Sequence, residues 1–362
     1  MIIRDLILAV IGIISGILLF CRFPIIKKGN NPTEKKVSIV IPCRNEQNNI
    51  RELLESLRQQ RTRPYEIICV DDQSTDQTAS VIRSFNEVKL VSVEDKPEDW
   101  NGKPYALTVG AKAATGDVLL FLDADVKLES DGLTDLFSAY ENKGNFSCHP
   151  YHKTKKCGES FALFFNMLSV AGTGITLPKP IQKGMFGPVL MVDKEIYFAA
   201  GAHENVRNSI IEDYDLGKHY KNKKIPYTLY LGNKAVSFRM YPEGIKSQAQ
   251  GFIKNFSKGA ISAGIISNLL TALYITGITL VFIQAIIGIA SLNLVSSLVF
   301  GGMYIFLAGH LFFVSSRLGR FNPLVCVFYF LPLIWFILIF LISIFAKVFH
   351  LNVVWKGRKI KP

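Results

Sequence analysis

The side chains best suited to chemistry follow directly after a short apolar run. Asp123 and Asp125 come after Val118–Leu122, and the small Ala124 between them lets both carboxylates reach one cation. In proteins, Mg²⁺ is bound through one or two carboxylates and shares its remaining positions with phosphate oxygens. This pair therefore predicts a site for Mg²⁺ or Mn²⁺ beside a phosphate-bearing ligand.

A second pair of carboxylates, Asp71 and Asp72, follows another apolar run at Glu66–Val70. Carboxylates at the tip of a strand are placed to accept hydrogen bonds from the base or ribose of a nucleotide. Ser74 and Asp76 are typical helix N-cap residues, so for these two a structural role is favoured.

The predicted strands and helices must bring these two pairs of aspartates to one edge of a sheet. Strands are predicted at Val37–Pro42, Glu66–Val70, Val88–Val93 and Val118–Leu122, and helices at Asn48–Arg61, Thr75–Phe85 and Pro104–Ala114. Such alternation is typical of an α/β fold with a mostly parallel sheet covered on both faces. Ligands bind at the carboxyl ends of these strands, where both acidic pairs lie.

Charge is distributed unevenly along the 362 residues. The chain has 41 Lys and Arg against 29 Asp and Glu, a formal net charge of +12, but the excess lies before residue 37 and after Glu243. A nucleic-acid-binding domain would carry basic residues on its own folded surface, so no nucleic-acid partner is expected. The six cysteines show no Cys-x-x-Cys spacing and give no metal framework.

Long charge-free runs predict membrane helices. A spanning helix needs about 20 apolar residues, and spans are predicted at Leu270–Ile289, Leu294–Val314 and Leu324–Phe345. Leu6–Phe20 is shorter and is followed by basic residues rather than a small-residue cleavage site, so it is interpreted as a retained anchor instead of a signal peptide. We therefore expect a multi-pass protein of the cell membrane.

The basic residues also predict an orientation. By the positive-inside rule, Arg22–Lys36 should lie in the cytoplasm together with the domain that follows. Three full spans after that domain would place the basic tail 347–362 outside, against the same rule. Pro323 and Pro332 bracket the start of the last hydrophobic segment, so a re-entrant or interfacial segment is the alternative.

Composition and charge together predict the organisation of the chain. The expected parts are a membrane anchor at 1–22, a basic linker at 23–36, a cytoplasmic α/β domain at 37–243, an amphipathic interfacial helix at 244–262, hydrophobic segments at 263–346 and a basic tail at 347–362. The basic parts are expected to face an anionic membrane surface.

Five motifs in fixed order resemble those of the family-2 inverting glycosyltransferases. They are Pro42-Cys43-Arg44-Asn45-Glu46, Val70–Asp76, Asn101-Gly102-Lys103, Asp123-Ala124-Asp125 and Glu212–Gly217. The resemblance implies a Rossmann-like, nucleotide-sugar-binding domain of the glycosyltransferase A type. Further stretches look like the membrane-bound members that glycosylate the carotenoid acid diaponeurosporenoate: Pro150–His152, Phe186–Pro188, Phe238–Tyr241 and Trp355–Arg358.

The resemblance implies roles for individual residues. Asp71 and Asp72 would contact the uridine of a UDP-sugar, Lys103 the diphosphate, and Asp125, helped by Asp123, the Mg²⁺ or Mn²⁺ ion. Asp213, next to Glu212, falls where the family keeps its catalytic base. The other residues implied on the donor side are Pro42, Arg44, Glu46, Lys254, Trp355 and Arg358.

One departure from the family pattern concerns the acceptor. Many processive members carry Gln-x-x-Arg-Trp after the base, whereas this chain reads Gln250-Gly251-Phe252-Ile253-Lys254-Asn255. The departure favours transfer of a single sugar, expected to be glucose, to a lipophilic acceptor from the bilayer. A carotenoid carboxylate is the expected acceptor, and the alternative is a hydroxyl-bearing membrane lipid of the ceramide, diacylglycerol or hopanoid type.

The kind of acceptor determines whether the site needs a catalytic base. A carboxylic acid with a pKa near 4 arrives ionised, so a base such as Asp213 has little left to do. His152, His203 and Arg239 are then candidates for orienting the acceptor anion, with a structural role as the alternative for each histidine. For Glu212 and Asp213 the alternative is an acidic first turn that complements a helix dipole.

Overall fold

A seven-stranded sheet forms the centre of the α/β part. The computed structural model describes residues 2–351, 353–355 and 358–360, and gives the side chains of residues 3–254 and 262–351. The strand order is β3-β2-β1-β4-β8-β6-β9, and only the pairs made by β8 are antiparallel. The strands are β1 (Val37–Cys43), β2 (Glu66–Asp71), β3 (Val88–Ser92), β4 (Val118–Leu122), β6 (Phe146–His149), β8 (Val189–Asp193) and β9 (Thr228–Leu231). The predicted mostly parallel α/β fold is confirmed.

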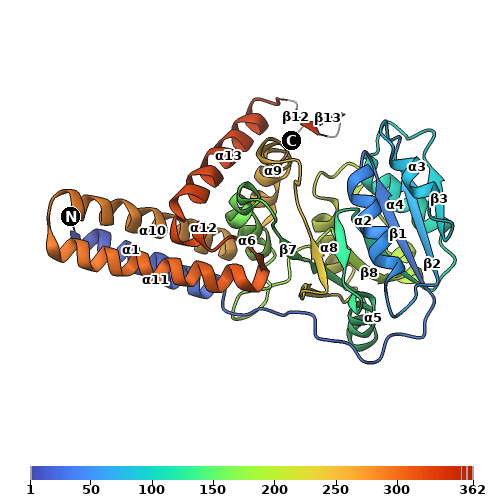
Figure 1. The fold of residues 1–362 in the computed structure, drawn as a ribbon, viewed down its shortest axis with the longest axis horizontal. Helices are drawn as coiled ribbons and strands as arrows, with labels where there is room; N and C mark the ends of the chain where they lie inside the picture. The colour runs from blue at the N-terminus through green and yellow to red at the C-terminus, as the bar shows by residue number, and fades with distance from the viewer. Residues whose placement is uncertain (1, 352, 356–357, 361–362) are drawn as a thin grey trace.

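Helices lie on both faces of this sheet (Figure 1), and the alternation of side chains along β1 explains how both faces are covered. Ile39 belongs to the core that includes Leu53 of α2, whereas Val40 belongs to the core that includes Leu107 of α4. A methyl group on Gly110 of α4 would overlap Val40, so this glycine lets the helix approach the sheet closely. The helices of this part are α2 (Gln47–Arg58), α3 (Thr78–Arg83), α4 (Gly102–Ala113), α5 (Gly132–Lys143), α7 (Lys194–Ala199) and α8 (Glu212–Asn222), with a 3₁₀ turn η2 (Glu204–Val206).

A second, four-stranded sheet joins the α/β part to the hydrophobic helices. Its order is β11-β7-β10-β5, from β5 (Val126–Leu128), β7 (Tyr151–Lys153), β10 (Val236–Phe238) and β11 (Gly319–Arg320). The last of these strands directly follows a long apolar helix, and its Gly319 pairs with His152 of β7. The end of that helix is therefore fixed to the α/β part.

Three long helices lie side by side and extend away from the α/β part: α1 (Ile2–Leu19), α10 (Ile265–Ala290) and α11 (Leu294–Leu318) (Figure 1). A Cβ atom on Gly12 would lie 2.5 Å from the Cα of Gly277, so α1 and α10 touch through glycines. Within the bundle, buried Asp5 accepts a 2.8 Å hydrogen bond from Nε2 of Gln284.

The third predicted span, Leu324–Phe345, is divided into α12 (Leu324–Val327) and α13 (Phe330–Val348). In the described part of the chain, α10, α11 and α13 are long and apolar enough to cross a membrane. However, α13 diverges from the other two and packs against α9 (Ile245–Ser262) (Figure 1). Ser343 Oγ donates to the carbonyl oxygen of Ile253 at 2.8 Å, which fixes the far half of α13 to α9.

Helix α6 (Leu163–Gly172), which follows the 3₁₀ segment η1 (Cys157–Ala162), connects the two parts of the molecule. It packs against α9, α10, α11 and α13, and its Phe165 ring stacks on Phe252 of α9 with centroids 3.8 Å apart. After α13 the chain continues into the hairpin β12 (Val353–Trp355) and β13 (Arg358–Ile360), whose first strand lies against α9.

Candidate active site

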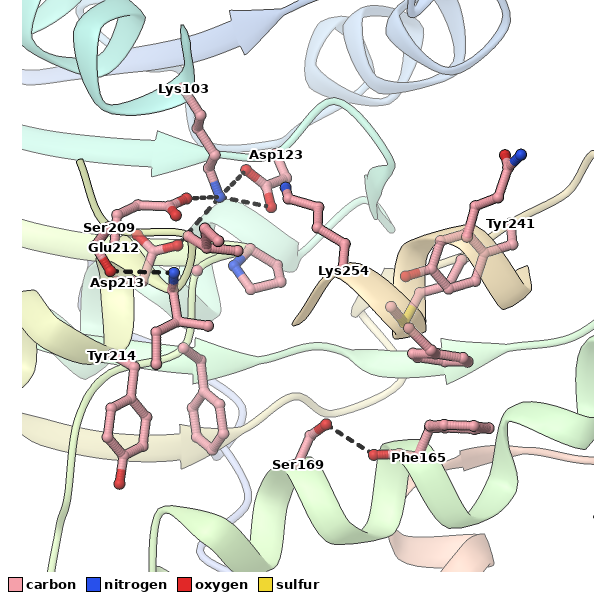
Figure 2. A pocket seen from close by; sticks show the side chains of 18 of the residues that line it. Lys103, Asp123, Phe165, Ser169, Ser209, Glu212, Asp213, Tyr214, Tyr241 and Lys254 are labelled. Carbon is pink, nitrogen blue, oxygen red and sulfur yellow. Dashed lines mark hydrogen bonds and ion pairs between the residues drawn. The ribbon is translucent and has the colours of Figure 1, made fainter. Parts of the chain in front are cut away.

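Lys103 gathers three carboxylates that are far apart in the sequence (Figure 2). It lies in the first turn of α4, and its Nζ is 2.9 Å from Asp123 Oδ1 at the end of β4. From the first turn of α8, Asp213 Oδ2 lies 3.1 Å and Glu212 Oε1 3.4 Å from the same nitrogen. Lys103 thus joins side chains from α4, the end of β4 and α8 at one point.

The pKa values in this cluster are set by burial and by mutual charge. Burial acts to lower the pKa of Lys103, but Asp123, Asp213 and Glu212 outweigh it and raise that pKa well above its usual value. Burial also acts to raise the pKa of Asp213, yet Lys103 and then His203 hold it well below the usual range. For Glu212, burial and the charge of Asp213 raise the pKa to about 7. Asp213 is therefore ionised at neutral pH.

Asp213 has close neighbours on two sides. His203 Nε2 lies 3.8 Å from Asp213 Oδ1, and the other ring nitrogen of this buried histidine is 2.6 Å from the Tyr197 hydroxyl. On the opposite side, a methyl group on Gly187 would overlap the Asp213 carboxylate and come within 3.1 Å of Lys103 Nζ. His203 therefore touches the predicted base, and Gly187 leaves the space that this carboxylate occupies.

The predicted nucleotide-binding residues lie at the ends of β1 and β2. Arg44 Nη1 donates to the carbonyl oxygens of Asp72 at 2.6 Å and Gln73 at 3.0 Å, which ties the two strand ends together. Asn45 has a φ of 51°, and its side-chain oxygen accepts from the backbone N–H of Thr75 at 2.8 Å. Pro42, Arg44, Glu46 and Asp72 line the main cavity, whereas Asp71 accepts a hydrogen bond from the backbone of Ser74.

Asp123 and Asp125 fit a divalent cation that shares its shell with a ligand. Both carboxylates line the cavity. Asp123 already makes an ion pair with Lys103, so a positive charge is stabilised at the end of β4. Among the described residues no group of three His, Cys, Asp or Glu side chains could hold a metal ion. Two carboxylates completed by phosphate oxygens are the arrangement expected for Mg²⁺ or Mn²⁺ bound with a nucleotide.

The remaining predicted residues take different positions. His152 is fully buried between Phe238 and Phe321, with Nδ1 3.3 Å from the Asn166 amide. Arg239 lines the cavity and makes a two-point ion pair with buried Glu159, at 2.5 and 3.2 Å.

Two groups of predicted residues come from the C-terminal third. Lys254 extends from α9 toward the Lys103 cluster (Figure 2), and its charge acts to lower the pKa of Glu212. Trp355 and Arg358 pair across the β12–β13 hairpin, and their side chains lie outside the part that the structure describes.

A single cavity of about 2220 Å³ extends from the Lys103 cluster to the hydrophobic helices. Residues of this cavity that the sequence did not single out for a role include Gly187, His149 and Asn101. Asn101 donates from its amide to the carbonyl oxygen of Ser209 at 2.9 Å and so positions the loop before α8. The motifs Asn101-Gly102-Lys103 and Phe186-Gly187-Pro188 were the available signals for two of these residues.

Comparison with known proteins gives the same family. The model of glycosyl transferase family 2 matches residues 38–175. The chain is 34% identical over 358 residues to 4,4'-diaponeurosporenoate glycosyltransferase of Staphylococcus aureus (strain USA300), with 95% of this chain and 93% of that protein aligned. The enzyme of strain MRSA252 matches with the same identity and coverage.

A solved structure supports the fold. A mannosyltransferase from Pyrobaculum calidifontis, in complex with GDP-Man and Mn²⁺, superposes with a TM-score of 0.50 at 18% identity, over 88% of this chain and 97% of that one. The family match, the extent of the relatives' similarity and the shared fold agree with one another. The chain belongs to glycosyltransferase family 2 and is a glycosyltransferase.

Proposed function

We propose that this enzyme transfers one sugar, glucose, from UDP-glucose to the carboxylate of a carotenoid acid such as diaponeurosporenoate. The observation that carries the proposal is the shared cavity. Asp123, Asp213 and Lys103 line it together with Ile275 of α10 and Phe340 of α13, which belong to apolar helices. A polar donor and an apolar acceptor can therefore meet in one space. The acceptor of the staphylococcal relatives, as their name gives it, has this chemistry.

In this proposal the donor binds at the ends of β1, β2 and β4. Asp72, with the Arg44 region behind it, receives the uridine, and Lys103 and Lys254 lie toward the diphosphate. Asp125, helped by Asp123, would hold a Mg²⁺ or Mn²⁺ ion, and the bound ion would supply positive charge next to the leaving diphosphate. The solved relative that contains GDP-Man and Mn²⁺ supports this part of the proposal by fold alone.

Transfer is a direct displacement with inversion. The acceptor oxygen forms a bond to the anomeric carbon on the face opposite the UDP, the bond from that carbon to the diphosphate oxygen breaks, and its electron pair leaves with UDP. A carboxylate acceptor is already ionised at neutral pH and gives up no proton. Asp213 then serves mainly to hold Lys103, together with Asp123 and Glu212.

The second candidate acceptor is a hydroxyl-bearing membrane lipid. The lowered pKa of Asp213 favours it, because an ionised carboxylate in the cavity could take the proton of an attacking hydroxyl. The two candidates share the donor site and differ only in what they require of Asp213.

The proposal also places the α/β part in the cytoplasm, with α1, α10 and α11 as full spans. In it, α12 and α13 form a re-entrant arm. Val327 accepts a 2.6 Å hydrogen bond from Tyr304, near the middle of α11, whereas Lys347 at the end of α13 lines the same cavity as Asp213. The arm thus enters the bilayer and returns, which puts the basic tail on the cytoplasmic side as the positive-inside rule requires.

An assay of purified protein in detergent tests the function. UDP-glucose is supplied with Mg²⁺ or Mn²⁺ and with either diaponeurosporenoate or diacylglycerol, and both UDP release and the mass of the product are followed. We expect metal-dependent UDP release that increases with the carotenoid acid, and a product that is heavier by one hexose. Release stimulated by diacylglycerol alone would replace the proposed acceptor with the second candidate.

A further inference from the structure

Beyond the polar cluster, the cavity continues between α6, α10 and α13. Leu168 and Ser169 of α6, Ile275 and Thr276 of α10, and Phe340 and Ile344 of α13 line this region, which we call the wedge. None of these six side chains is ionisable. Figure 2 shows Ser169 on α6 across the cavity from Lys103 and Asp213, so the wedge begins opposite the polar cluster.

The wedge is closed where α10 and α13 meet. The rings of Phe282 on α10 and Phe330 on α13 stack with centroids 4.7 Å apart, and the Tyr329 hydroxyl donates to the carbonyl oxygen of Ile278 at 3.3 Å. From this junction α13 diverges from α10 (Figure 1), and both helices pack against α6. The space between them therefore widens toward the α/β part.

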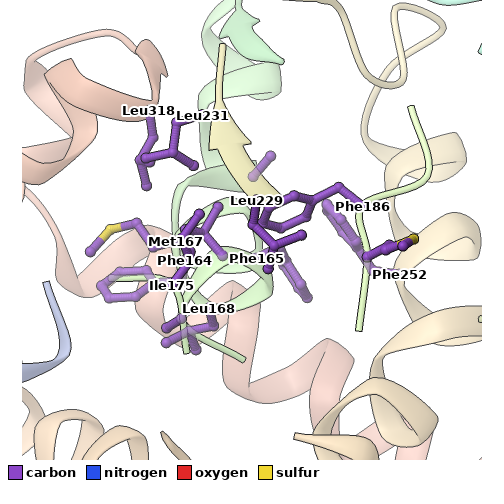
Figure 3. Packing of buried hydrophobic residues seen from close by; sticks show 14 of the residues in the cluster. Phe164, Phe165, Met167, Leu168, Ile175, Phe186, Leu229, Leu231, Phe252 and Leu318 are labelled. Carbon is purple, nitrogen blue, oxygen red and sulfur yellow. The ribbon is translucent and has the colours of Figure 1, made fainter. Parts of the chain in front are cut away.

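Helix α6 has one face that is packed and one that remains available. Figure 3 shows Phe164 and Met167 of α6 within the hydrophobic cluster that also contains Leu229 of β9 and Leu318 of α11. Ser169 lies outside this cluster and is exposed, and its hydroxyl donates to the carbonyl oxygen of Phe165 at 2.7 Å. The hydroxyl is thus satisfied within its own helix, which leaves the surface toward the wedge suitable for an apolar ligand.

The wedge is also open toward the bilayer. Thr276 and Ile344 line the cavity and are nevertheless exposed, Ile344 to 39%. The surface around this opening carries exposed apolar side chains such as Ile342 and Phe345 of α13, as expected where lipid surrounds the protein. A chain dissolved in the membrane can enter here without crossing water.

We infer that the wedge binds the long apolar chain of the acceptor, with its terminal oxygen group directed to Lys103 and Asp213. The inference rests on the proposed function in taking the acceptor to be lipophilic. It assigns the selection of long chains to α6, α10 and α13, and it makes lateral entry from the bilayer the route of the acceptor.

Two substitutions that fill the wedge test the inference, Ser169→Trp and Ile344→Trp. Ile342→Trp is the matched control, because Ile342 is exposed on α13 and is not among the residues that line the cavity. The acceptors are a C30 polyene monocarboxylic acid and decanoic acid. For each variant, transfer is divided by the acceptor-independent release of UDP from UDP-glucose, which reports the donor site, and the melting temperature reports folding.

We expect both wedge variants to lose about tenfold or more in kcat/KM for the C30 acid, through a higher KM, with a much smaller loss for decanoic acid. The control should resemble the unsubstituted enzyme with both acids. Equal losses with the two acids, or full activity of both wedge variants on the C30 acid, would overturn the inference.

The same variants separate this inference from the proposed function. If the unsubstituted enzyme uses diacylglycerol and no carboxylic acid, the proposed acceptor is wrong, and the variants are then compared with long-chain and short-chain diacylglycerols. A selective loss with the long-chain lipid would still support the wedge, and an unselective one would reject it.

Discussion

Lys103 determines the geometry of the site at the scale of residues. Its ammonium group brings together Asp123 from the end of β4 and two carboxylates from the start of α8. Without it, the half-buried Asp123 and the buried Glu212 and Asp213 would repel one another. The effect of a substitution near Lys103 on the reaction should therefore depend on which of these three carboxylates it displaces.

Asp213→Asn distinguishes the two kinds of acceptor. With a hydroxyl acceptor we expect a loss of about 100-fold or more in kcat, because proton removal needs a base. With a carboxylate acceptor most of the activity should remain, since no proton is removed. The control is Asp215→Asn on the same helix, whose carboxylate instead accepts from the Ser209 hydroxyl. Steady-state rates with both acceptors provide the measurement, and an equally large loss with the carboxylate would contradict the account.

Gly187→Ala should disturb the site without a change in charge. The added methyl group would overlap the Asp213 carboxylate and crowd Lys103, so we expect a loss of activity with an intact fold. Gly158→Ala is the control, because a Cβ atom there meets nothing within 4 Å. Activity and melting temperature are compared for both, and a Gly187→Ala enzyme with normal rates would show that this close approach is unimportant.

Glu212 should make stability depend on pH. Its pKa rises to about 7 in the folded state, above the usual value of a glutamate, because of burial and Asp213. The folded protein then holds this proton more tightly than the unfolded chain, so the contribution of Glu212 to stability is present at low pH and is lost as pH rises through the usual glutamate range to 7. Glu212→Gln should flatten this decline. Melting temperatures at pH 5 and pH 8 test it, and an unchanged difference between them would exclude Glu212 as the cause.

At the scale of elements, the junction between the α/β part and α13 depends on a buried ion pair. Glu159 of η1 binds Arg239, next to β10, and its carbonyl oxygen accepts from Gln248 of α9 at 3.4 Å. Gln248 in turn accepts from Trp335 Nε1 of α13 at 3.0 Å. Elements far apart in the sequence are thus connected through one group of polar side chains.

Glu159→Gln should weaken this junction. We expect a destabilisation of about 2 kcal/mol, less than for a fully buried pair because Arg239 is partly exposed. Glu243→Gln, which changes an exposed carboxylate in the segment after Arg239, should have little effect. Thermal unfolding in detergent compares the two variants, and equal melting temperatures would show that the ion pair contributes nothing to the junction.

The sequence predicted the elements of the sheet better than their contacts. The run Val118–Leu122 is apolar throughout and is buried throughout, so β4 was predicted residue by residue. The meeting of Lys103 with Asp213, 110 residues later, depends on how α8 packs and has no local signal. The burial of His152 beside Phe238 and Phe321 and the pairing of Arg239 with Glu159 likewise arise only in the folded molecule.

The direction of α13 could not be predicted for a related physical reason. Its sequence is apolar on nearly every side, so composition gives its length but not the helix against which it packs. The hydrogen bonds of Ser343 and Trp335 to α9 supply that information. They support the proposed re-entrant arm, which was the alternative to a full span that the sequence left open for the last hydrophobic segment.

At the scale of the whole molecule, the proposed re-entrant arm makes a prediction about topology. A cysteine added after Pro362 in a variant without the exposed Cys21 and Cys157 should be protected from an impermeant thiol reagent in intact cells and react in inside-out vesicles. A cysteine placed in the turn at Leu292, between α10 and α11, should show the opposite pattern. Labelling of the C-terminal cysteine in intact cells would require α13 to be a full span.

The account depends most on the chemistry of the acceptor, because the proposed function requires one cavity to hold both a UDP-sugar and a lipophilic acceptor. The most direct measurement is the linkage formed when purified enzyme, UDP-glucose and a divalent cation are incubated with diaponeurosporenoate. We predict a glucosyl ester, identified by mass and by its cleavage with neutral hydroxylamine. No ester from diaponeurosporenoate, together with a hydroxylamine-resistant glucoside in a parallel incubation with diacylglycerol, would contradict the account.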